Sequence, residues 1–197
     1  MDHYYKDVPG WAAFTDLYRN VVDAASPDKK STFVEIGSWL GRSAAFMGVE
    51  IKNSGKPITL HCVDPWIDGG PDLRDTHYFR GLRGESPYDI FLRNVHRVMD
   101  VIMPCRMTSI DAASRFDNKS IDFLMIDGDH GYEAVRNDLA VWLPKMRVGG
   151  IVSGDDYLWP GVKRACEERF GIGGVQTHIH KQAPDYRKSV SYWWKQL

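Results

Sequence analysis

Cysteine is scarce in this chain, and its placement excludes two common kinds of small protein. Only three cysteines occur among 197 residues, and none shows the paired spacing of a zinc site or of a disulfide framework. Cys62 and Cys105 lie in apolar, strand-like stretches, whereas Cys166 lies in a helix-like one. We therefore expect three buried free thiols.

Long apolar runs and an excess of one charge are also missing. No stretch approaches the roughly 20 apolar residues that cross a bilayer, and residues 1–7 lack the apolar core of a signal peptide. With 25 basic against 26 acidic residues the formal charge is −1, so no strong field exists to hold a nucleic acid or an anionic membrane. These features predict a cytoplasmic protein with a small-molecule partner.

What the sequence does contain is an alternation of strand-like and helix-like segments. Hydrophobic residues make up 43% of the chain, enough to bury the core of a single domain over residues 1–197. This alternation predicts parallel βαβ units, and so an α/β fold with helices on both faces of a mostly parallel sheet. The apolar, β-type runs that carry this prediction are residues 32–36, 58–63, 101–107, 121–126 and 150–153.

The last third of the chain carries further element signals. Apolar residues from Tyr132 to Met146 recur at helical spacing, and a second helix is expected to begin at Pro160 and to stop at Gly171. Residues 175–180 and 189–195 predict an antiparallel strand pair at a sheet edge. Trp193 and Trp194 are interpreted as packing of that edge or as an oligomer contact.

Residues 65–87 form the least regular segment, because glycine and proline interrupt any long periodic element. The segment follows the end of the second apolar run, where open α/β sheets bind ligands, so we interpret it as a substrate lid or insertion. Its aromatic and basic side chains suit either a substrate-binding surface or packing of the loop itself. They are Trp66, Arg74, Tyr78, Phe79, Arg80 and Arg83.

A glycine turn joins the first apolar run to the next helix. Gly37 and Gly41 let the backbone turn tightly beside a ligand. The bulky Trp39 between them disfavours a diphosphate, which needs a G-x-G-x-x-G turn. Glu35 suits a cationic group, and Asp64 is placed to accept hydrogen bonds from ribose hydroxyls. The pair of carboxylates predicts a nucleoside that bears an amino group.

Four aspartates follow two of the apolar runs, Asp127 and Asp129 after one and Asp155 and Asp156 after the other. If the two strands are neighbours, the carboxylates share one rim of the sheet, which is costly unless a cation or a proton neutralises them. Hard oxygen ligands without thiolates favour Mg²⁺, Mn²⁺ or Ca²⁺ over zinc. Solvated acids that cap helices are the alternative interpretation.

With these motifs the sequence resembles the class I S-adenosylmethionine-dependent methyltransferases. The E/D-x-G-x-x-x-G motif of that family matches Glu35, Gly37 and Gly41, and its ribose carboxylate matches Asp64. The resemblance implies a Rossmann-like fold with a mostly parallel seven-stranded sheet and a C-terminal antiparallel hairpin, and S-adenosylmethionine as the cofactor. The cofactor-binding residues that it implies are Glu35, Gly37, Ser38, Gly41, Asp64, Ser109 and Asp127.

The acidic stretches are similar to those of divalent-metal-dependent O-methyltransferases, above all the macrocin-type sugar methyltransferases. The resemblance implies a divalent cation, Mg²⁺ foremost, held by Asp127, Asp155 and Asp156, although catechol-type relatives carry Asn at the position of Asp156. It leaves two candidates for the general base. Asp129 matches the base of sugar-modifying relatives and is favoured; His130, with an ordinary pKa near ~6.5, is the alternative.

These expectations predict methyl transfer to a small hydroxylated substrate, such as a sugar, a phenol or a natural product. Nucleic acid and membrane partners are not expected, and a homo-oligomer is left open. Two other functions also stay open: a glycosyltransferase, since Asp127 and Asp129 form a D-x-D pair, and a non-catalytic adenosylmethionine-binding module. The remaining histidines on predicted elements are taken as structural or exposed; they are His61, His96, His178 and His180.

Overall fold

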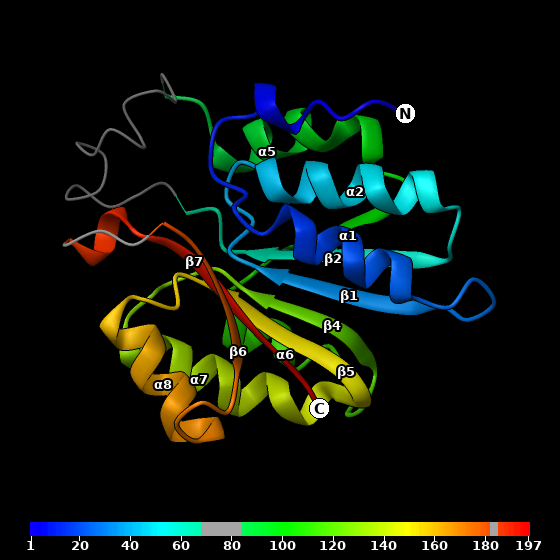
Figure 1. Ribbon diagram of the computed structural model, residues 1–197. Helices are drawn as coiled ribbons and strands as arrows, with labels where there is room; N and C mark the ends of the chain where they lie inside the picture. The colour runs from blue at the N-terminus through cyan, green and yellow to red at the C-terminus, as the bar shows by residue number, and fades with distance from the viewer. Residues whose placement is uncertain (68–83, 182–184) are drawn as a thin grey trace.

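A seven-stranded sheet runs through the molecule in the order β3-β2-β1-β4-β5-β7-β6 (Figure 1). The computed structural model describes residues 1–67, 84–181 and 185–197. The first five strands are parallel to one another, and β7 runs antiparallel to both β5 and β6. The strands are β1 (Ser31–Ile36), β2 (Ile58–Asp64), β3 (Ile102–Arg106), β4 (Ile121–Ile126), β5 (Met146–Asp155), β6 (Gln176–Lys181) and β7 (Val190–Gln196).

Helices cover both faces of this sheet (Figure 1). One face carries α1 (Thr15–Ala24), α2 (Arg42–Ser54) and α5 (Pro87–Val95). The other carries α6 (Ser109–Ala113), α7 (Tyr132–Trp142) and α8 (Pro160–Phe170). Four short 3₁₀ helices complete the described elements: η1 (Tyr5–Asp7), η2 (His96–Val98), η3 (Leu143–Lys145) and η4 (Tyr186–Lys188). The predicted α/β fold is confirmed.

The two central strands explain why the apolar runs were recognisable. Phe33 of β1 and Phe123 of β4 pack into the core beneath α1 and α2, whereas Val34 and Leu124 face the core beneath α7 and α8. A strand that is buried on both faces needs apolar residues at every position rather than at alternate ones. Near-continuous apolar runs therefore marked these parallel strands.

One predicted helix is shorter than expected. The apolar spacing predicts a helix from Tyr132 to Met146, but α7 ends at Trp142 and continues as η3, which contains Pro144. Proline lacks the N–H that a helix interior requires, so the regular helix stops there. Met146 then begins β5, which is longer than the predicted run of residues 150–153. The helix from Pro160, followed by Gly171, is confirmed.

The C-terminal strand pair is antiparallel and ends the sheet, as predicted, but its inner strand is β7. The strand at the edge is β6, and all six of its residues are exposed. Trp193 is buried against α8, and Trp194 packs against the core on the opposite face. Both tryptophans therefore pack within the strand pair that ends the sheet, although their own strand, β7, lies between β5 and the outermost strand β6. The oligomer contact stays a prediction.

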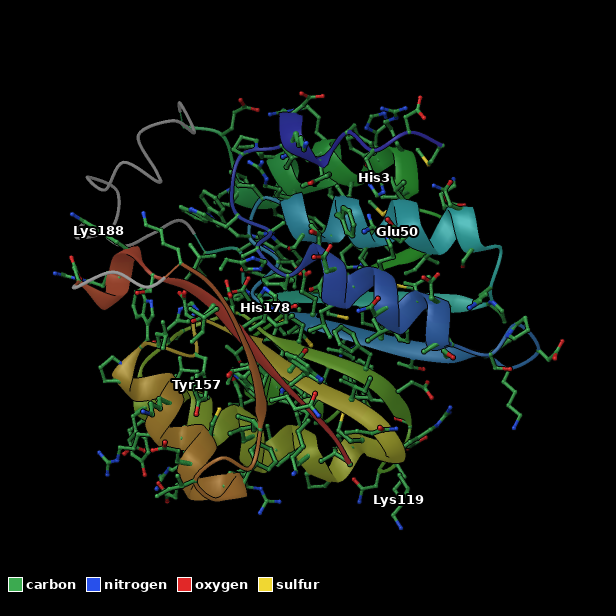
Figure 2. All side chains as sticks on the ribbon, viewed as in Figure 1. His3, Glu50, Lys119, Tyr157, His178 and Lys188 are labelled. Atoms are coloured by element: carbon green, nitrogen blue, oxygen red, sulfur yellow. The ribbon has the colours of Figure 1, made fainter. Side chains whose placement is uncertain are left out.

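The strand order places a crevice at the carboxyl ends of β1 and β4. The chain passes from β1 outward to β2 and β3 in one direction, and from β4 to β5 in the other. Loops diverge at such a switch point, which is where open α/β sheets bind ligands. The N-terminal segment reaches this region after crossing α2, where His3 Nε2 lies 2.8 Å from Glu50 Oε1 (Figure 2). Over the described ranges, no helix has the length and apolar character needed to cross a membrane.

Candidate active site

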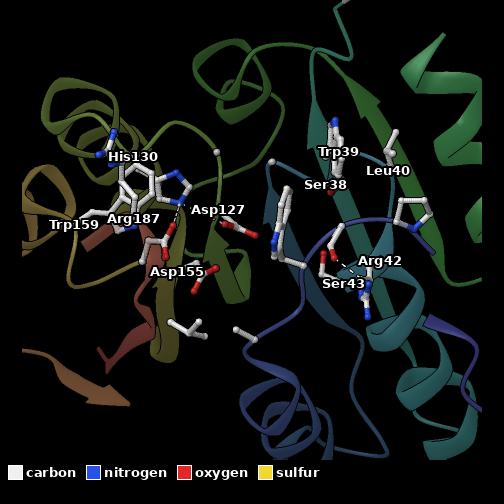
Figure 3. A pocket seen from close by; sticks show the side chains of 18 of the residues that line it. Ser38, Trp39, Leu40, Arg42, Ser43, Asp127, His130, Asp155, Trp159 and Arg187 are labelled. Atoms are coloured by element: carbon white, nitrogen blue, oxygen red, sulfur yellow. Dashed lines mark hydrogen bonds and ion pairs between the residues drawn. The ribbon is translucent and has the colours of Figure 1, made fainter. Parts of the chain in front are cut away.

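A cavity of about 500 Å³ opens at the carboxyl ends of the central strands. Figure 3 shows Ser38, Trp39 and Arg42 on one side of it and His130, Trp159 and Arg187 on the other, with Asp127 between them. Five segments form its walls: residues 9–13, the glycine turn at 37–43, the loop after β4, the end of β5 with the loop after it, and residues 187–190. The site is thus assembled from both ends and the middle of the chain.

The two glycines of the turn are required by close approaches of the backbone. Gly37 has a φ of +86°, and a Cβ atom built on it would lie 2.1 Å from the carbonyl oxygen of Asp127. Gly41, at φ +87°, precedes α2, and its Cβ would lie 2.8 Å from Val95 Cγ1 and 2.9 Å from Phe91 Cδ2. Only glycine fits these positions, so the turn lies directly against β4 and α5.

Asp64 holds the backbone of the glycine turn in place. Its Oδ2 accepts a hydrogen bond from the Trp39 N–H (2.9 Å), and its Oδ1 accepts one from the Trp66 N–H (2.7 Å). Burial raises the pKa of Asp64, and these two backbone donors counteract the rise. Asp64 is not among the residues that line the cavity, so its role in binding ribose stays a prediction.

Trp39 adopts a backbone conformation that is rare for an aromatic residue. Its φ is +38°, and strained backbone of this kind persists only when the surroundings hold it. Besides the bond to Asp64, the Trp39 carbonyl accepts a hydrogen bond from Trp66 Nε1 (2.6 Å). Trp11, from the N-terminal segment, stacks on the Trp39 ring at 5.5 Å. Hydrogen bonds with Asp64 and Trp66 therefore hold the backbone of the turn, and the ring of Trp11 covers the ring of Trp39.

Of the side chains assigned to the lid at residues 65–87, the structure describes that of Trp66. Trp66 is only 2% exposed and packs against Phe91 and Tyr88. Trp66 therefore belongs to the core, which agrees with the interpretation of these side chains as packing of the loop and not as a substrate-binding surface. The other side chains assigned to the lid, Arg74, Tyr78, Phe79, Arg80 and Arg83, lie outside the described residues.

Glu35 is fully buried beneath the glycine turn. One carboxylate oxygen accepts a hydrogen bond from the Tyr18 hydroxyl (2.6 Å), and the other has no hydrogen-bond partner among the described residues. Burial raises the pKa of Glu35 to about 7, against the opposing effect of the hydroxyls of Tyr18, Ser38 and Ser43. Ser38 and Ser43 line the cavity directly above it. The binding of a cationic group by Glu35 stays a prediction.

Three of the four predicted aspartates meet at the cavity. Asp127, Asp155 and Asp156 all line it, and so does His130. Burial raises the pKa of all three carboxyls, that of Asp156 to about 6. The pKa of Asp155 lies well above its usual range, because the charges of Asp127 and Asp156 add to the effect of burial. This end of the cavity therefore favours a bound cation or proton.

His130 stands among these carboxylates. Its Nε2 lies 3.5 Å from Asp127 Oδ1 and 3.4 Å from Asp156 Oδ2 (Figure 3). Burial lowers the pKa of His130, but Asp127, Asp156 and Asp129 outweigh it, and the net pKa is raised. The imidazole ring also contacts Trp159, at 5.1 Å between ring centroids. His130 is thus a proton acceptor whose charged form the site stabilises.

The backbone conformation at Asp156 restricts which residue types fit this position. Its φ is +52°, the left-handed region that Asn and Asp tolerate better than other residues with a side chain. Asp and Asn therefore satisfy the same backbone requirement at this position. An Asp156→Asn exchange would therefore alter the charge of the site while suiting the same backbone conformation.

Two predicted site residues lie elsewhere. Asp129 is exposed, and its Oδ1 accepts a hydrogen bond from the Gly131 N–H (2.7 Å) just before α7. The Ser109 hydroxyl donates to Asp138 Oδ1 and accepts a hydrogen bond from Trp142 Nε1 (2.8 Å). Neither side chain lines the cavity. The structure thus brings His130, and not the favoured Asp129, to the centre of the site.

Sequence reasoning missed two walls of the cavity. The first is residues 9–13, anchored where Arg42 Nη1 donates to the carbonyls of Val8 (3.2 Å) and Gly10 (3.0 Å). The second is the basic segment with Arg187 and Lys188. No local motif marks either wall, because each reaches the site through contacts between distant parts of the chain.

The carboxylates of Asp127, Asp155 and Asp156 suit the predicted divalent ion chemically, because they offer hard oxygen ligands. Asp155 Oδ1 is moreover buried without a hydrogen-bond partner among the described residues. The side chains do not form a preformed site, however: in the part of the chain that the structure describes, no group of three His, Cys, Asp or Glu residues is arranged to hold a metal. The ion stays a prediction.

Comparison with known families identifies the class of protein. Residues 34–157, more than half of the chain, match a family described as a methyltransferase domain. The chain belongs to this family, and its fold is that of the class I S-adenosylmethionine-dependent methyltransferases. The matched range contains every residue predicted to bind cofactor or metal, whereas both walls missed from the sequence lie outside it.

Solved structures share this fold over nearly the whole chain. The O-methyltransferase TomG from Streptomyces achromogenes, solved in complex with S-adenosylmethionine, has a TM-score of 0.60 at 16% identity, covering 95% of this chain and 81% of its own. The O-methyltransferase NovP has a TM-score of 0.59 at 19% identity, covering 94% of this chain and 80% of its own. CalS11, a TDP-rhamnose 3′-O-methyltransferase of calicheamicin biosynthesis, has a TM-score of 0.55 at 15% identity, covering 90% of this chain and 75% of its own. At these identities the likeness shows the fold.

One relative in sequence is the uncharacterized protein y4gI of Sinorhizobium fredii (strain NBRC 101917 / NGR234). It is 23% identical over 150 residues, which make up 76% of this chain. The matched part spans only 15% of that relative's length. This relative therefore tells us about a domain and not about the activity of a whole protein.

Proposed function

We propose that this protein transfers the methyl group of S-adenosylmethionine to a hydroxyl oxygen of a small molecule, with His130 as the general base. The observation that carries the proposal is the position of His130: its Nε2 is buried at the cavity, opposite the glycine turn, and has no hydrogen bond among the described residues. Neighbours in fold described as O-methyltransferases, TomG and NovP, support transfer to oxygen.

In the proposed reaction the cofactor occupies the wall formed by the glycine turn. Gly37, Ser38 and Gly41 line that wall, and the carboxylates of Glu35 and Asp127 lie near enough to influence each other, so the region favours the cationic sulfonium. S-adenosylmethionine held there would supply the methyl group: its carbon–sulfur bond would break as the carbon–oxygen bond to the acceptor forms, leaving S-adenosylhomocysteine. In-line attack of this kind needs the acceptor oxygen roughly 3–3.5 Å from the methyl carbon.

His130 takes the proton of the acceptor hydroxyl. Neutral imidazole accepts the proton at Nε2, and the carboxylates of Asp127 and Asp156, 3.4–3.5 Å away, stabilise the imidazolium that results. Asp129 is turned toward the start of α7 and does not face the cavity. The proposal therefore replaces the base favoured from the sequence by its neighbour.

We include a divalent cation, Mg²⁺ foremost, in the proposal. Asp127, Asp155 and Asp156 would hold it, and the raised pKa of their carboxyls indicates that the site gains from a neutralising charge. A bound cation of this kind lowers the pKa of a coordinated hydroxyl. His130 Nε2 now lies between two of these carboxylates, so ion binding requires the imidazole to turn away from them.

The acceptor is proposed to be a small hydroxylated ring compound, such as a sugar or a phenol. Trp11, Trp39 and Trp159 give the cavity aromatic walls, and Arg187 and Lys188 add positive charge at its rim. Aromatic faces pack against sugar and phenol rings alike. CalS11 is described as acting on a nucleotide-linked sugar, and the basic rim of this cavity suits an acceptor of similar charge.

The test is a methyl-transfer screen. The purified protein is incubated with Mg²⁺, trideuteromethyl-labelled S-adenosylmethionine and a panel of hydroxylated sugars, nucleotide-linked sugars and phenols, and products are identified by mass spectrometry. We expect a labelled methyl ether from at least one acceptor class. Tight cofactor binding without transfer to any acceptor would instead favour a non-catalytic adenosylmethionine-binding module.

A further inference from the structure

A second cavity, of about 590 Å³, lies on the outer part of the sheet along β2 and β3. It lies on the face that carries α6, a helix of only five residues, and Arg115, Phe116 and Asp117 from the segment after α6 contribute to its lining. No residue of its lining belongs to the lining of the methyltransferase cavity. Its lining contains a nitrogen donor and three sulfur donors, from His61, Met103, Cys105 and Met107.

The strand register brings these donors together. His61 of β2 pairs directly with Met103 of β3, and Cys105 follows two residues later on the same face of the strand. Cys105 Sγ consequently lies 4.0 Å from His61 Nδ1. Unlike Cys62 and Cys166, which are buried as predicted, Cys105 is only partly buried. A ligand that enters the groove therefore meets the thiol and the imidazole together.

The groups around the pair suit a ligand that binds lone pairs. The His61 ring stands edge-on to Phe116 at 5.0 Å, which fixes its orientation, and burial lowers the pKa of His61. Burial raises the pKa of the Cys105 thiol, and the charge of Arg115 opposes that rise. The other nearby cation, Arg106, lies over the ring of Tyr88 at 5.0 Å, on the opposite face of the sheet.

We propose that Cys105 and His61 bind one Cu(I) ion, with the thioether of Met103 as a third ligand. Thiolate and thioether sulfur are soft ligands, which select Cu(I) over harder ions such as Mg²⁺. On binding, the thiol loses its proton to solvent as the copper–sulfur bond forms. The copper stays in its +1 state, so the step needs no oxidant or reductant.

Zinc fits this pair less well. A structural zinc site needs four ligands, and among the residues that the structure describes no third His, Cys, Asp or Glu joins the pair as a metal ligand.

The test is an anaerobic competition titration of the full chain against a chromophoric Cu(I) chelator such as bicinchoninate. We expect the wild type to withdraw one Cu(I) per chain. Cys105→Ser and His61→Gln should each weaken binding by at least about 100-fold, beyond the range typical of outer-shell changes, and Met103→Leu should weaken it less. The matched control, Cys166→Ser, alters a buried thiol of α8 and should leave binding unchanged.

Thermal unfolding of each variant distinguishes a lost ligand from a lost fold. His61→Gln and Cys105→Ser change side chains at the groove, so melting temperatures near that of the wild type are expected. Failure of the wild type to compete for Cu(I), or binding that Cys105→Ser and His61→Gln leave unchanged, would overturn the proposal. So would tighter binding of Zn²⁺ than of Cu(I) at the same pair.

Discussion

Asp129 and His130 are neighbours in one loop, yet they end in opposite surroundings. The Asp129 carboxylate accepts the Gly131 N–H just before α7 and is exposed, whereas His130 Nε2 is buried between Asp127 and Asp156. Both residues have the chemistry of a general base, so residue type alone does not separate them. The conformation of the turn decides which side chain faces the cavity.

This placement gives a direct prediction about the base. With the acceptor found by the screen, His130→Gln should lower kcat by about 100-fold or more, the usual contribution of a general base. Asp129→Asn should change kcat only a few-fold, because the asparagine oxygen can accept the same hydrogen bond from Gly131. Steady-state kinetics measure both values, and binding of S-adenosylhomocysteine checks that each variant is intact. A larger loss for Asp129→Asn than for His130→Gln would restore the base favoured from the sequence.

Asp138 supplies a second prediction at this scale, about stability. It is 6% exposed within α7, where burial raises its pKa to about 6 against the opposing hydrogen bond from Ser109. Because the folded pKa lies above the unfolded value near ~3.9, its contribution to stability is fully present below about pH 4 and is lost as pH rises through about 6.

Asp138→Asn removes the charge and keeps an acceptor for Ser109. We expect it to raise the free energy of unfolding by about 1–2 kcal/mol at pH 8 and to change it little at pH 4. Urea unfolding at the two pH values measures the difference. The exposed Asp28→Asn serves as the control for the removal of a carboxylate at the surface. Equal effects of Asp138→Asn at both pH values would contradict the burial of a raised-pKa carboxyl.

At the scale of elements, the turn between β1 and α2 depends on glycine for steric reasons. Gly37 directly follows β1 and Gly55 directly follows α2, and both have positive φ, +86° and +66°. A Cβ atom at Gly37 would collide with the Asp127 carbonyl at 2.1 Å, whereas one at Gly55 meets nothing within 4 Å. A substitution at Gly55 therefore meets only the cost of the left-handed backbone, whereas one at Gly37 meets that cost and a steric clash.

Alanine at each position tests this difference. Gly55→Ala should cost about 1–2 kcal/mol, the usual cost of the left-handed conformation for a residue with a Cβ atom. Gly37→Ala should cost more than about 4 kcal/mol and abolish the stabilisation by S-adenosylhomocysteine. Thermal unfolding with and without that ligand gives both results. If the two variants lose similar stability, the turn does not lie against β4 as described.

The carboxyl ends of β4 and β5 carry the metal prediction. Asp155→Asn should abolish stimulation of turnover by Mg²⁺, because it removes one of three proposed ligands, while Asp129→Asn should keep that stimulation. Activity is measured after chelation and after Mg²⁺ is restored. Full turnover in the chelated wild type would remove the divalent ion from the proposal and leave proton removal by His130 as its remaining part.

Over the whole molecule, the sequence predicted the sheet better than the site. Strands such as β1 and β4 are buried on both faces, so their apolar runs show in the sequence directly. Met146 was assigned to a helix because periodicity alone does not register that Pro144 ends it. Trp11 reaches the cavity by stacking on Trp39, 28 positions further along the chain by subtraction of their numbers, and such a long-range contact leaves no local pattern.

The two cavities lie in different parts of the molecule and contain different kinds of donor atoms. Hard carboxylate donors and His130 gather at the central crevice, whereas the sulfur donors of Met103 and Cys105 lie with His61 at the outer part of the sheet. Hard and soft cations prefer these two sets respectively. Mg²⁺ is therefore expected to leave Cu(I) binding unchanged, and the two proposals stand or fall independently.

A methyltransferase site built on the glycine turn is tested by calorimetric titration of the full chain with S-adenosylhomocysteine. We expect saturable binding of one molecule per chain, lost in Gly37→Ala. Binding of a nucleoside diphosphate with Mn²⁺, together with no heat from S-adenosylhomocysteine, would contradict it and favour a glycosyltransferase using the Asp127 and Asp129 pair.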